Sequence, residues 1–226
     1  MKHRVFLLFF VLLSLNVKGE RIIGNLNTGD DLLRERVGVE FGLFYQRAIA
    51  FRTPDYEIEI EDVILRLENS LSGGVPVVTL NADNGMTSAP GAIQFTFNNP
   101  TLSDPVGDFT FLAPSTFTLQ PNTVYWILVD HLDNSSLFQW VSSSTFNPNE
   151  SSGIAVQVGN LFSLDDGTVY SGGGGVPGFQ INGTVIRKPI PSLSQWGMIV
   201  LMLLMMCTGV VVLNLKRKSL LQITAD

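Results

Sequence analysis

The chain has 226 residues, a formal net charge of −6 and one cysteine, Cys207. Its length suits a single domain of ordinary size, and a lone cysteine excludes both a disulfide framework and a thiolate metal site. From Leu67 to Ile186 there is no lysine or arginine. Without a positive footprint for a phosphate backbone, nucleic acid is excluded as a partner.

Residues 1–19 have the layout of a secretory signal peptide. Two basic residues precede the apolar stretch from Val5 to Leu15, and Val17 and Gly19 stand at the −3 and −1 positions of a cut before Glu20. The apolar stretch is shorter than the roughly 20 residues that cross a bilayer, which argues against an uncleaved anchor. We therefore predict export and removal of this segment.

The mature chain is predicted to be all-β over residues 37–187, after a leader over residues 20–36. Short apolar or alternating runs are separated by clusters of Gly, Pro, Asn, Asp and Ser. Helical periodicity is weak, and only Asp30 to Glu35 is predicted to form a turn of helix. The predicted strands are Val37–Phe44, Arg47–Phe51, Tyr56–Leu67, Val75–Leu80, Ala92–Phe97, Asp108–Leu112, Thr116–Leu119, Thr123–Asp130, Leu137–Ser142, Gly153–Val158 and Gly178–Ile186.

Two of these strands indicate how the sheet is built. Apolar residues alternate with glutamates from Tyr56 to Glu61, which is typical of a strand with one buried face. The inward phase then jumps from Ile60 to Val63, and a β-bulge would absorb this step. The run from Val124 to Val129 is apolar on both faces, which indicates a covered central strand. We predict a β-sandwich of the jelly-roll kind, with a closed barrel as the alternative.

Several short motifs follow one another between Tyr45 and Val141. They are Gln46 to Phe51, Thr53, Ile60-x-x-Val63-x-Leu65-x-Leu67, Asp83-Asn84-Gly85, Pro90-Gly91, Phe109-x-Phe111, Leu119-x-Pro121-Asn-Thr-x-Tyr125-Trp126 and Trp140. Their order resembles the bacterial surface module called the choice-of-anchor R domain. The resemblance implies export and surface display. It carries over no catalytic residue.

Catalytic chemistry has little support in the mature chain. Its one histidine, His131, is predicted to be a surface residue at the end of a strand, and neither a Gly-x-Ser-x-Gly elbow nor a His-Glu-x-x-His helix occurs. The segments 83–85 and 165–167, Asp-Asn-Gly and Asp-Asp-Gly, are predicted turns, with a calcium site as the alternative. We predict no catalytic residue, metal or cofactor.

Three aromatic residues, Trp126, Trp140 and Tyr170, are candidates for a stacking platform. They support an alternative function, a carbohydrate-binding or adhesive module that contacts extracellular polysaccharide and sits on an ordinary single-pass membrane anchor. A third hypothesis, a secreted glycoside-active enzyme, would need two carboxylates converging in a cleft.

The C-terminal tail has three parts. Residues 188–197 form a proline-containing linker, residues 198–215 are predicted to be a transmembrane helix, and residues 216–226 follow as a cytoplasmic tail. Lys216, Arg217 and Lys218 form a basic stop, which places the tail in the cytoplasm and the body outside it.

The linker contains Ile190, Pro191, Ser192, Leu193, Trp196 and Gly197. This segment is similar to the Ile-Pro-Thr-Leu-x-x-Trp-Gly signature of the IPTL-CTERM sorting signals, which belong with the PEP-CTERM class of bacterial surface proteins. Ser192 replaces the usual threonine, and Ser219 to Asp226 extend beyond the basic cluster.

The resemblance implies recognition, and cutting near the motif, by an exosortase, a multi-pass membrane enzyme that acts as a protease or transpeptidase. The sequence thus predicts a non-enzymatic bacterial surface protein. Its precursor would be held in the inner membrane, and the mature form would reach the cell surface or an extracellular matrix.

Overall fold

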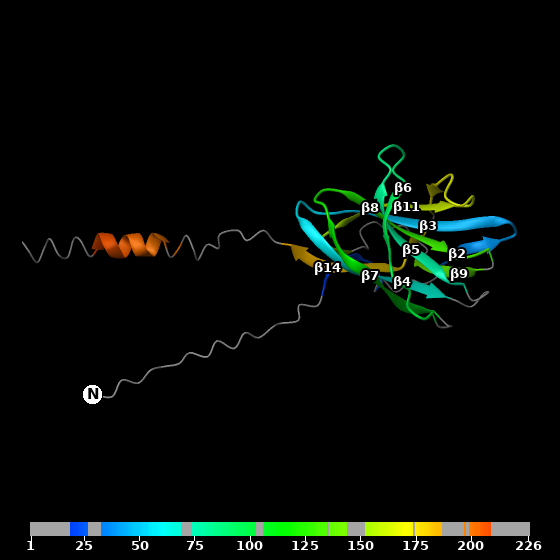
Figure 1. The fold of residues 1–226 in the computed structure, drawn as a ribbon, viewed down its shortest axis with the longest axis horizontal. Helices are drawn as coiled ribbons and strands as arrows, with labels where there is room; N and C mark the ends of the chain where they lie inside the picture. The colour runs from blue at the N-terminus through cyan, green and yellow to red at the C-terminus, as the bar shows by residue number, and fades with distance from the viewer. Residues whose placement is uncertain are drawn as a thin grey trace, which may run out of the picture. The chain divides into compact units, whose positions relative to one another are not determined.

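The computed structural model describes residues 19–26, 33–68, 74–102, 106–134, 136–143, 152–173, 175–186, 197 and 199–208. The chain divides into two compact units, Met1–Ile186 and Arg187–Asp226. The described part of the first unit is mostly β (Figure 1), and that of the second contains a short helix over residues 199–208. The predicted all-β class is therefore confirmed for the first unit, while the jelly-roll arrangement stays a prediction.

The strands of the first unit pair in an antiparallel manner. They are β1 (Glu20–Gly24), β2 (Leu33–Glu40), β3 (Leu43–Arg52), β4 (Glu57–Glu68), β5 (Pro76–Asp83), β6 (Pro90–Thr96), β7 (Gly107–Leu119), β8 (Val124–His131), β9 (Leu137–Ser143), β10 (Ser152–Gly153), β11 (Val156–Ser163), β12 (Ser171–Gly172), β13 (Val176–Pro177) and β14 (Phe179–Ile186). Their order is β10-β1-β14-β4-β9-β2-β3-β8-β5-β6, and β7, β11, β12 and β13 pair with β4, β3, β11 and β9. The described sheet is open, and the closed-barrel alternative is not seen in it.

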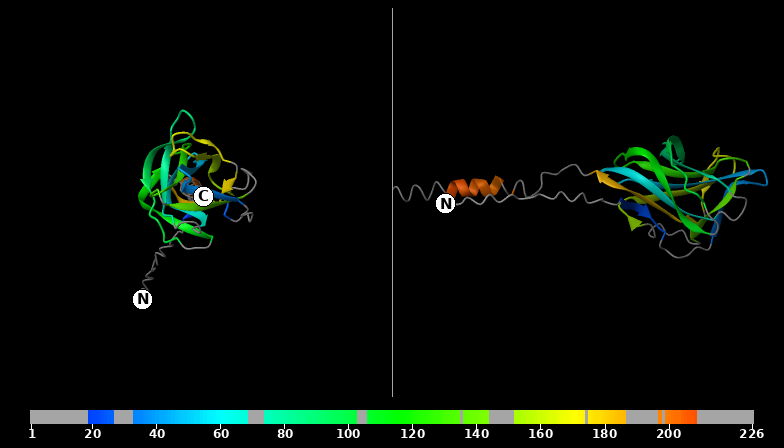
Figure 2. Two further views of the ribbon diagram at one scale, coloured as in Figure 1. Left: turned by 90° about the vertical axis from the view of Figure 1, so that its right-hand side faces the viewer. Right: turned by 60° about the horizontal axis from the view of Figure 1, so that its bottom comes forward.

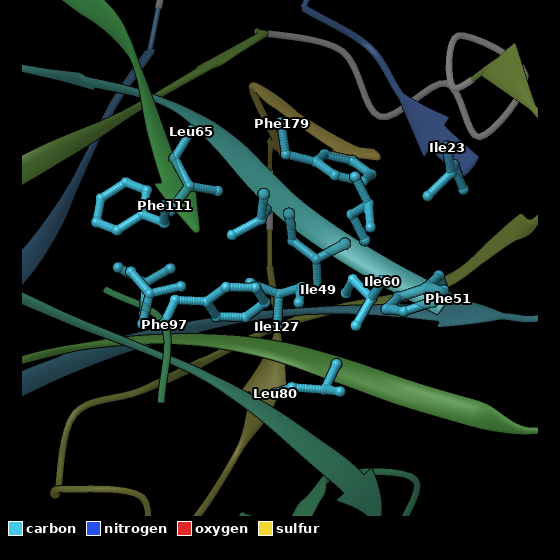
Figure 3. Packing of buried hydrophobic residues seen from close by; sticks show 14 of the residues in the cluster. Ile23, Ile49, Phe51, Ile60, Leu65, Leu80, Phe97, Phe111, Ile127 and Phe179 are labelled. Carbon is cyan, nitrogen blue, oxygen red and sulfur yellow. The ribbon is translucent and has the colours of Figure 1, made fainter. Parts of the chain in front are cut away.

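The sheet folds over a single main core, and Figure 2 shows strands on opposite sides of the body. Leu65 of β4, Phe111 of β7 and Phe179 of β14 belong to the same buried cluster as Ile49 of β3 and Ile127 of β8 (Figure 3). All five side chains are fully buried. Because each large apolar side chain contributes about 1.5–3 kcal/mol when it leaves water, this cluster supplies the main stabilisation of the body.

Strand β8 is buried on both faces, as predicted from its apolar run. Tyr125, Ile127 and Val129 point into the main core. Trp126 and Leu128 alternate with them and form a second cluster with two alanines of β3. The strand lies between β3 and β5 in the sheet, which confirms its central position.

The predicted bulge in β4 is also present. Its register with β7 shifts between Ile60 and Asp62, and its register with β14 shifts at the same place. Ile58, Ile60 and Val63 are all buried, so the extra residue, Glu61, lets the inward phase continue across the step.

Some predicted boundaries are wrong. The single strand predicted over Val37–Phe44 is interrupted by a turn at Phe41 and Gly42, whose φ angles are 52° and 78°. Residues after this turn begin β3, and the two strands form a hairpin. The strands predicted over Asp108–Leu112 and Thr116–Leu119 are one strand, β7, which runs on past the bulge in β4.

The described part of the predicted leader over residues 20–36 includes β1 and the first residues of β2, which belong to the sheet. Strand β1 pairs with β14, and Ile22 and Ile23 are fully buried. The turn of helix predicted over Asp30–Glu35 is wrong for its described residues, since Leu33 to Glu35 lie in β2 and pair with β9. A pair of isoleucines is too short a signal to predict a strand, and pairing with β14 decides the conformation.

Candidate functional site

The predicted aromatic platform does not form on the surface. Trp126 and Trp140 are only 2% and 0% exposed. The Trp126 Nε1–H donates to Asp83 Oδ1 at 2.8 Å, and the Trp140 Nε1–H donates to the Gly178 carbonyl oxygen at 2.9 Å. Both indoles are thus buried with their polar atoms satisfied, and the prediction that they stack on a sugar ring is wrong.

The third aromatic candidate, Tyr170, belongs to a polar cluster with Gln46, Asp130 and Asp166. The Gln46 Nε2–H₂ donates to Asp130 Oδ2 at 2.9 Å and to Asp166 Oδ1 at 3.0 Å. The Tyr170 hydroxyl donates to Gln46 Oε1 at 3.0 Å. These four residues, the Gln46 cluster, attach the segment after β11 to strands β3 and β8.

Burial shifts the pKa values of two members of the Gln46 cluster, Asp130 and Tyr170. It raises the pKa of Asp130 above its usual value, and a hydrogen bond from the His131 backbone partly opposes this shift. Burial also raises the pKa of Tyr170 to about 12, and the nearby charges of Asp130, Asp166 and Asp165 act in the same direction. Near neutral pH the phenol is therefore protonated and acts as a donor, which suits a structural role rather than proton abstraction.

His131 lies at the end of β8, as predicted, but its side chain is not on the surface. Only 6% of the side chain is exposed, and the ring stacks on Phe44 with centroids 6.0 Å apart. Its Nδ1 lies 2.8 Å from Asp130 Oδ1.

The two Asx-Gly segments are turns. Gly85 and Gly167 have φ angles of 72° and 79°, which glycine adopts without strain. Asn84 Oδ1 accepts hydrogen bonds from the backbone of Met86 and Thr87, and Asp165 Oδ1 accepts from the Val169 backbone. Hydrogen bonds from Ser163 and Val169 lower the pKa of Asp165. Within the described ranges, no three His, Cys, Asp or Glu side chains gather as metal ligands would.

The sequence gives little sign of the Gln46 cluster. Its members come from β3, from the end of β8 and from the segment after β11, and their separation reaches 124 residues. Antiparallel pairing of β3 with both β8 and β11 brings them together. Predicting this contact would require the register in which β3 pairs with β8 and β11, and the sequence does not specify that register.

The second unit contains the other candidate site. Its helix over residues 199–208 rises about 15 Å, against the roughly 30 Å of a bilayer core. None of the helices among the described residues has the length and apolar content needed for a membrane span. The side chains from Ile199 to Met206 are between 49% and 64% exposed. The Thr208 hydroxyl donates back to the carbonyls of Leu204 and Met205.

Most of the predicted motif lies outside the described residues. Of its members, only Gly197 is described. The residues that fall outside are Ile190, Pro191, Ser192, Leu193 and Trp196, together with Lys216, Arg217 and Lys218 of the basic stop and residues 1–18 of the signal peptide.

Comparison with known families gives a match within the second unit. Residues 188–209 match the IPTL-CTERM motif, a sorting signal recognised by an exosortase-like membrane enzyme. The match extends over the linker and the described helix, so this end of the chain carries a sorting signal of a surface protein. A comparison with curated proteins finds no match.

Proposed function

We propose that this chain is an exported bacterial cell-surface protein that is anchored by, and processed at, its C-terminal sorting signal, and that its β body is not catalytic. The match of residues 188–209 to the IPTL-CTERM motif carries the proposal. Under it, the tail is the substrate of an exosortase-like enzyme, and the body is the cargo that reaches the surface.

The chemistry of the tail suits this role. Prolines such as Pro189 and Pro191 fix their own φ angles and disfavour helix for the residues before them, so we expect the linker to meet the membrane extended, in a form that a protease-like site can bind. Residues 198–215 are long enough to cross a bilayer as a helix that extends the described one, and Lys216 to Lys218 would hold its end in the cytoplasm.

The body suits the role of displayed cargo. Its three candidate aromatic residues make hydrogen bonds within the fold. The two buried indoles donate to Asp83 and to the Gly178 carbonyl oxygen, and the Tyr170 hydroxyl donates to Gln46. We propose that the body is a β-sandwich similar to the choice-of-anchor R module. The alternative of a carbohydrate-binding module loses two of its three aromatic residues to the interior, so the sorting-signal function is preferred.

The decisive test replaces Pro191 in the native host. Wild type is expected to lose the residues after the motif and to leave the inner membrane, whereas the Pro191→Ala variant is expected to keep residues 216–226 and stay in the inner membrane. The Pro189→Ala variant is a matched control, since it removes a proline from the same linker but lies outside the Ile190–Gly197 motif. Retention of the whole tail by wild type would refute the proposal.

A further inference from the structure

The backbone just before β1 lies against a carboxylate of β4. A side-chain carbon added at Gly19 would collide with Oε2 of Glu61. Because such a carbon stands about 1.5 Å from the α-carbon, this contact puts Oε2 within roughly 4 Å of the Gly19 α-carbon. The Glu61 carboxylate therefore faces the point where the predicted signal peptide meets the mature chain.

The rest of the sheet fixes this arrangement. Glu20 pairs with Gly183 of β14, and Gly183 pairs in turn with Ile60 of β4. Glu61 is the extra residue of β4 in its pairing with β14, and its side chain reaches β14, where Oε1 accepts a hydrogen bond from the Thr184 hydroxyl. One carboxylate oxygen is thus held by β14 while the other faces Gly19.

Cleavage before Glu20 would change the charge at this point. In the uncut chain the Gly19–Glu20 link is a neutral amide. Hydrolysis adds water across the C–N bond, and the carboxylate of Gly19 leaves with the signal peptide while Glu20 keeps an α-amino group. That group is protonated below about pH 8, so a positive charge appears beside Glu61.

We propose that the Glu61 carboxylate binds the α-ammonium group that signal-peptide removal creates on Glu20, and that this ion pair fastens β1 to the sheet only in the processed protein. The proposal rests on the export step of the proposed function. The bulge in β4 would then have a second role besides packing, because it places Glu61 opposite the new N-terminus.

The short length of strand β1 and its position beside a short edge strand explain why an ion pair at its first residue would stabilise it. It is only five residues long, yet it buries Ile22 and Ile23 completely. It lies next to the short edge strand β10, which offers two residues for pairing. A charge pair at its first residue opposes fraying from that end, and an uncut chain lacks the pair. Removal of the signal peptide would thereby complete the sheet.

The sequence offers a clean way to measure this ion pair. Between Glu20 and Pro189 there is a single lysine, Lys188, so the α-amine has one internal reference amine on the exported side. The mature protein, isolated from its host, is treated with an N-hydroxysuccinimide acetate ester over pH 6–10, and acetylation of the N-terminal peptide is followed by mass spectrometry.

Wild type is expected to acetylate at the α-amine about three to ten times more slowly near neutral pH than the Glu61→Gln variant, since a neighbouring carboxylate favours the protonated amine. The reference at Lys188 should be unchanged. Glu57→Gln removes the same charge from the same strand but pairs with Ile186, away from Gly19, and should behave as wild type.

A second variant keeps the test informative if Glu61→Gln does not accumulate. Thr184→Val removes the hydroxyl that holds Oε1, and it should speed acetylation in the same direction by a smaller factor. Equal rates in wild type and in the Glu61 or Thr184 variant would overturn the proposal, as would a mature N-terminus other than Glu20. The C-terminal mass in the same spectra reports separately on the sorting signal, so the two proposals can fail independently.

Discussion

The β body and the C-terminal helix use the same apolar residue types in opposite ways. Ile127 in β8 and Leu65 in β4 are fully buried, while Leu201 and Leu203 of the helix are 52% and 55% exposed. In the strands, alternation and pairing supply each apolar face with a partner from the same chain. A helix that is apolar all round has no polar face to turn to water, and such helices belong in a large core or a membrane. The strands thus bury their apolar side chains against one another, whereas the described helix leaves its own exposed.

The largest expected effect on stability comes from removing a large buried side chain from the β body. Trp140→Ala should lower the free energy of unfolding by about 3–5 kcal/mol, because it opens a cavity and removes one of the two N–H groups, those of Trp140 and the Arg66 backbone, that donate to the Gly178 carbonyl oxygen. Urea unfolding followed by circular dichroism measures the change. The matched control is Ile93→Ala in β6, whose side chain is 61% exposed and whose loss should cost less than about 0.5 kcal/mol. Similar costs at both positions would contradict the assigned core.

A charge in the helix tests the other side of the comparison. Leu203→Asp should weaken membrane insertion by about 2.5–3.5 kcal/mol, the cost of an aspartate at the centre of a spanning helix. The urea midpoint of the body should not move, since Leu203 lies outside its compact unit. Membrane fractionation and urea unfolding of the same preparations measure both effects, and Leu203→Met is the matched apolar control. If Leu203→Asp destabilises the body but still inserts, the two regions are not independent.

The smallest expected effect concerns the buried carboxylate of the Gln46 cluster. Burial raises the folded-state pKa of Asp130 above 3.8, so its favourable contribution is complete below about pH 4 and is lost as the pH rises through the raised pKa. The stability of wild type relative to Asp130→Asn should therefore fall as the pH rises from 3 to 6. Because a quarter of the side chain is exposed, and Gln46 and the His131 backbone donate to it, the change should be at most about 1 kcal/mol.

Urea midpoints across this pH range provide the measurement. Asp55→Asn is the control, since it removes a carboxylate that is exposed in the turn before β4. His131 on the same strand and Asp166 and Tyr170 from the segment after β11 also face Asp130. A slope of the same size in Asp130→Asn would show that the Asp130 carboxylate is not its source. That outcome would remove Asp130 from this role.

The sequence predicted those parts of the fold that depend on local pattern. The two-faced apolar run of β8 and the phase jump in β4 both predicted features that the structure contains. The sequence-based prediction was wrong where residues distant in the chain determine conformation or burial. Strand β1 forms because β14 pairs with it, and His131 is buried because Phe44 covers it. The burial of Trp126 and Trp140 could not be predicted either, because an indole has the same apolar character on the surface and in the core. The motif in the tail could be predicted because it is contiguous, as the match over residues 188–209 shows.

Processing at the sorting signal is measured by the intact mass of the mature protein, compared between the native host and a strain that lacks the exosortase-like enzyme. We predict a mass in the native host that corresponds to a chain starting at Glu20 and ending near the motif, and a chain in the mutant strain that still ends at Asp226. Identical masses in the two strains, both including residues 216–226, would contradict the account and make the tail an ordinary membrane anchor.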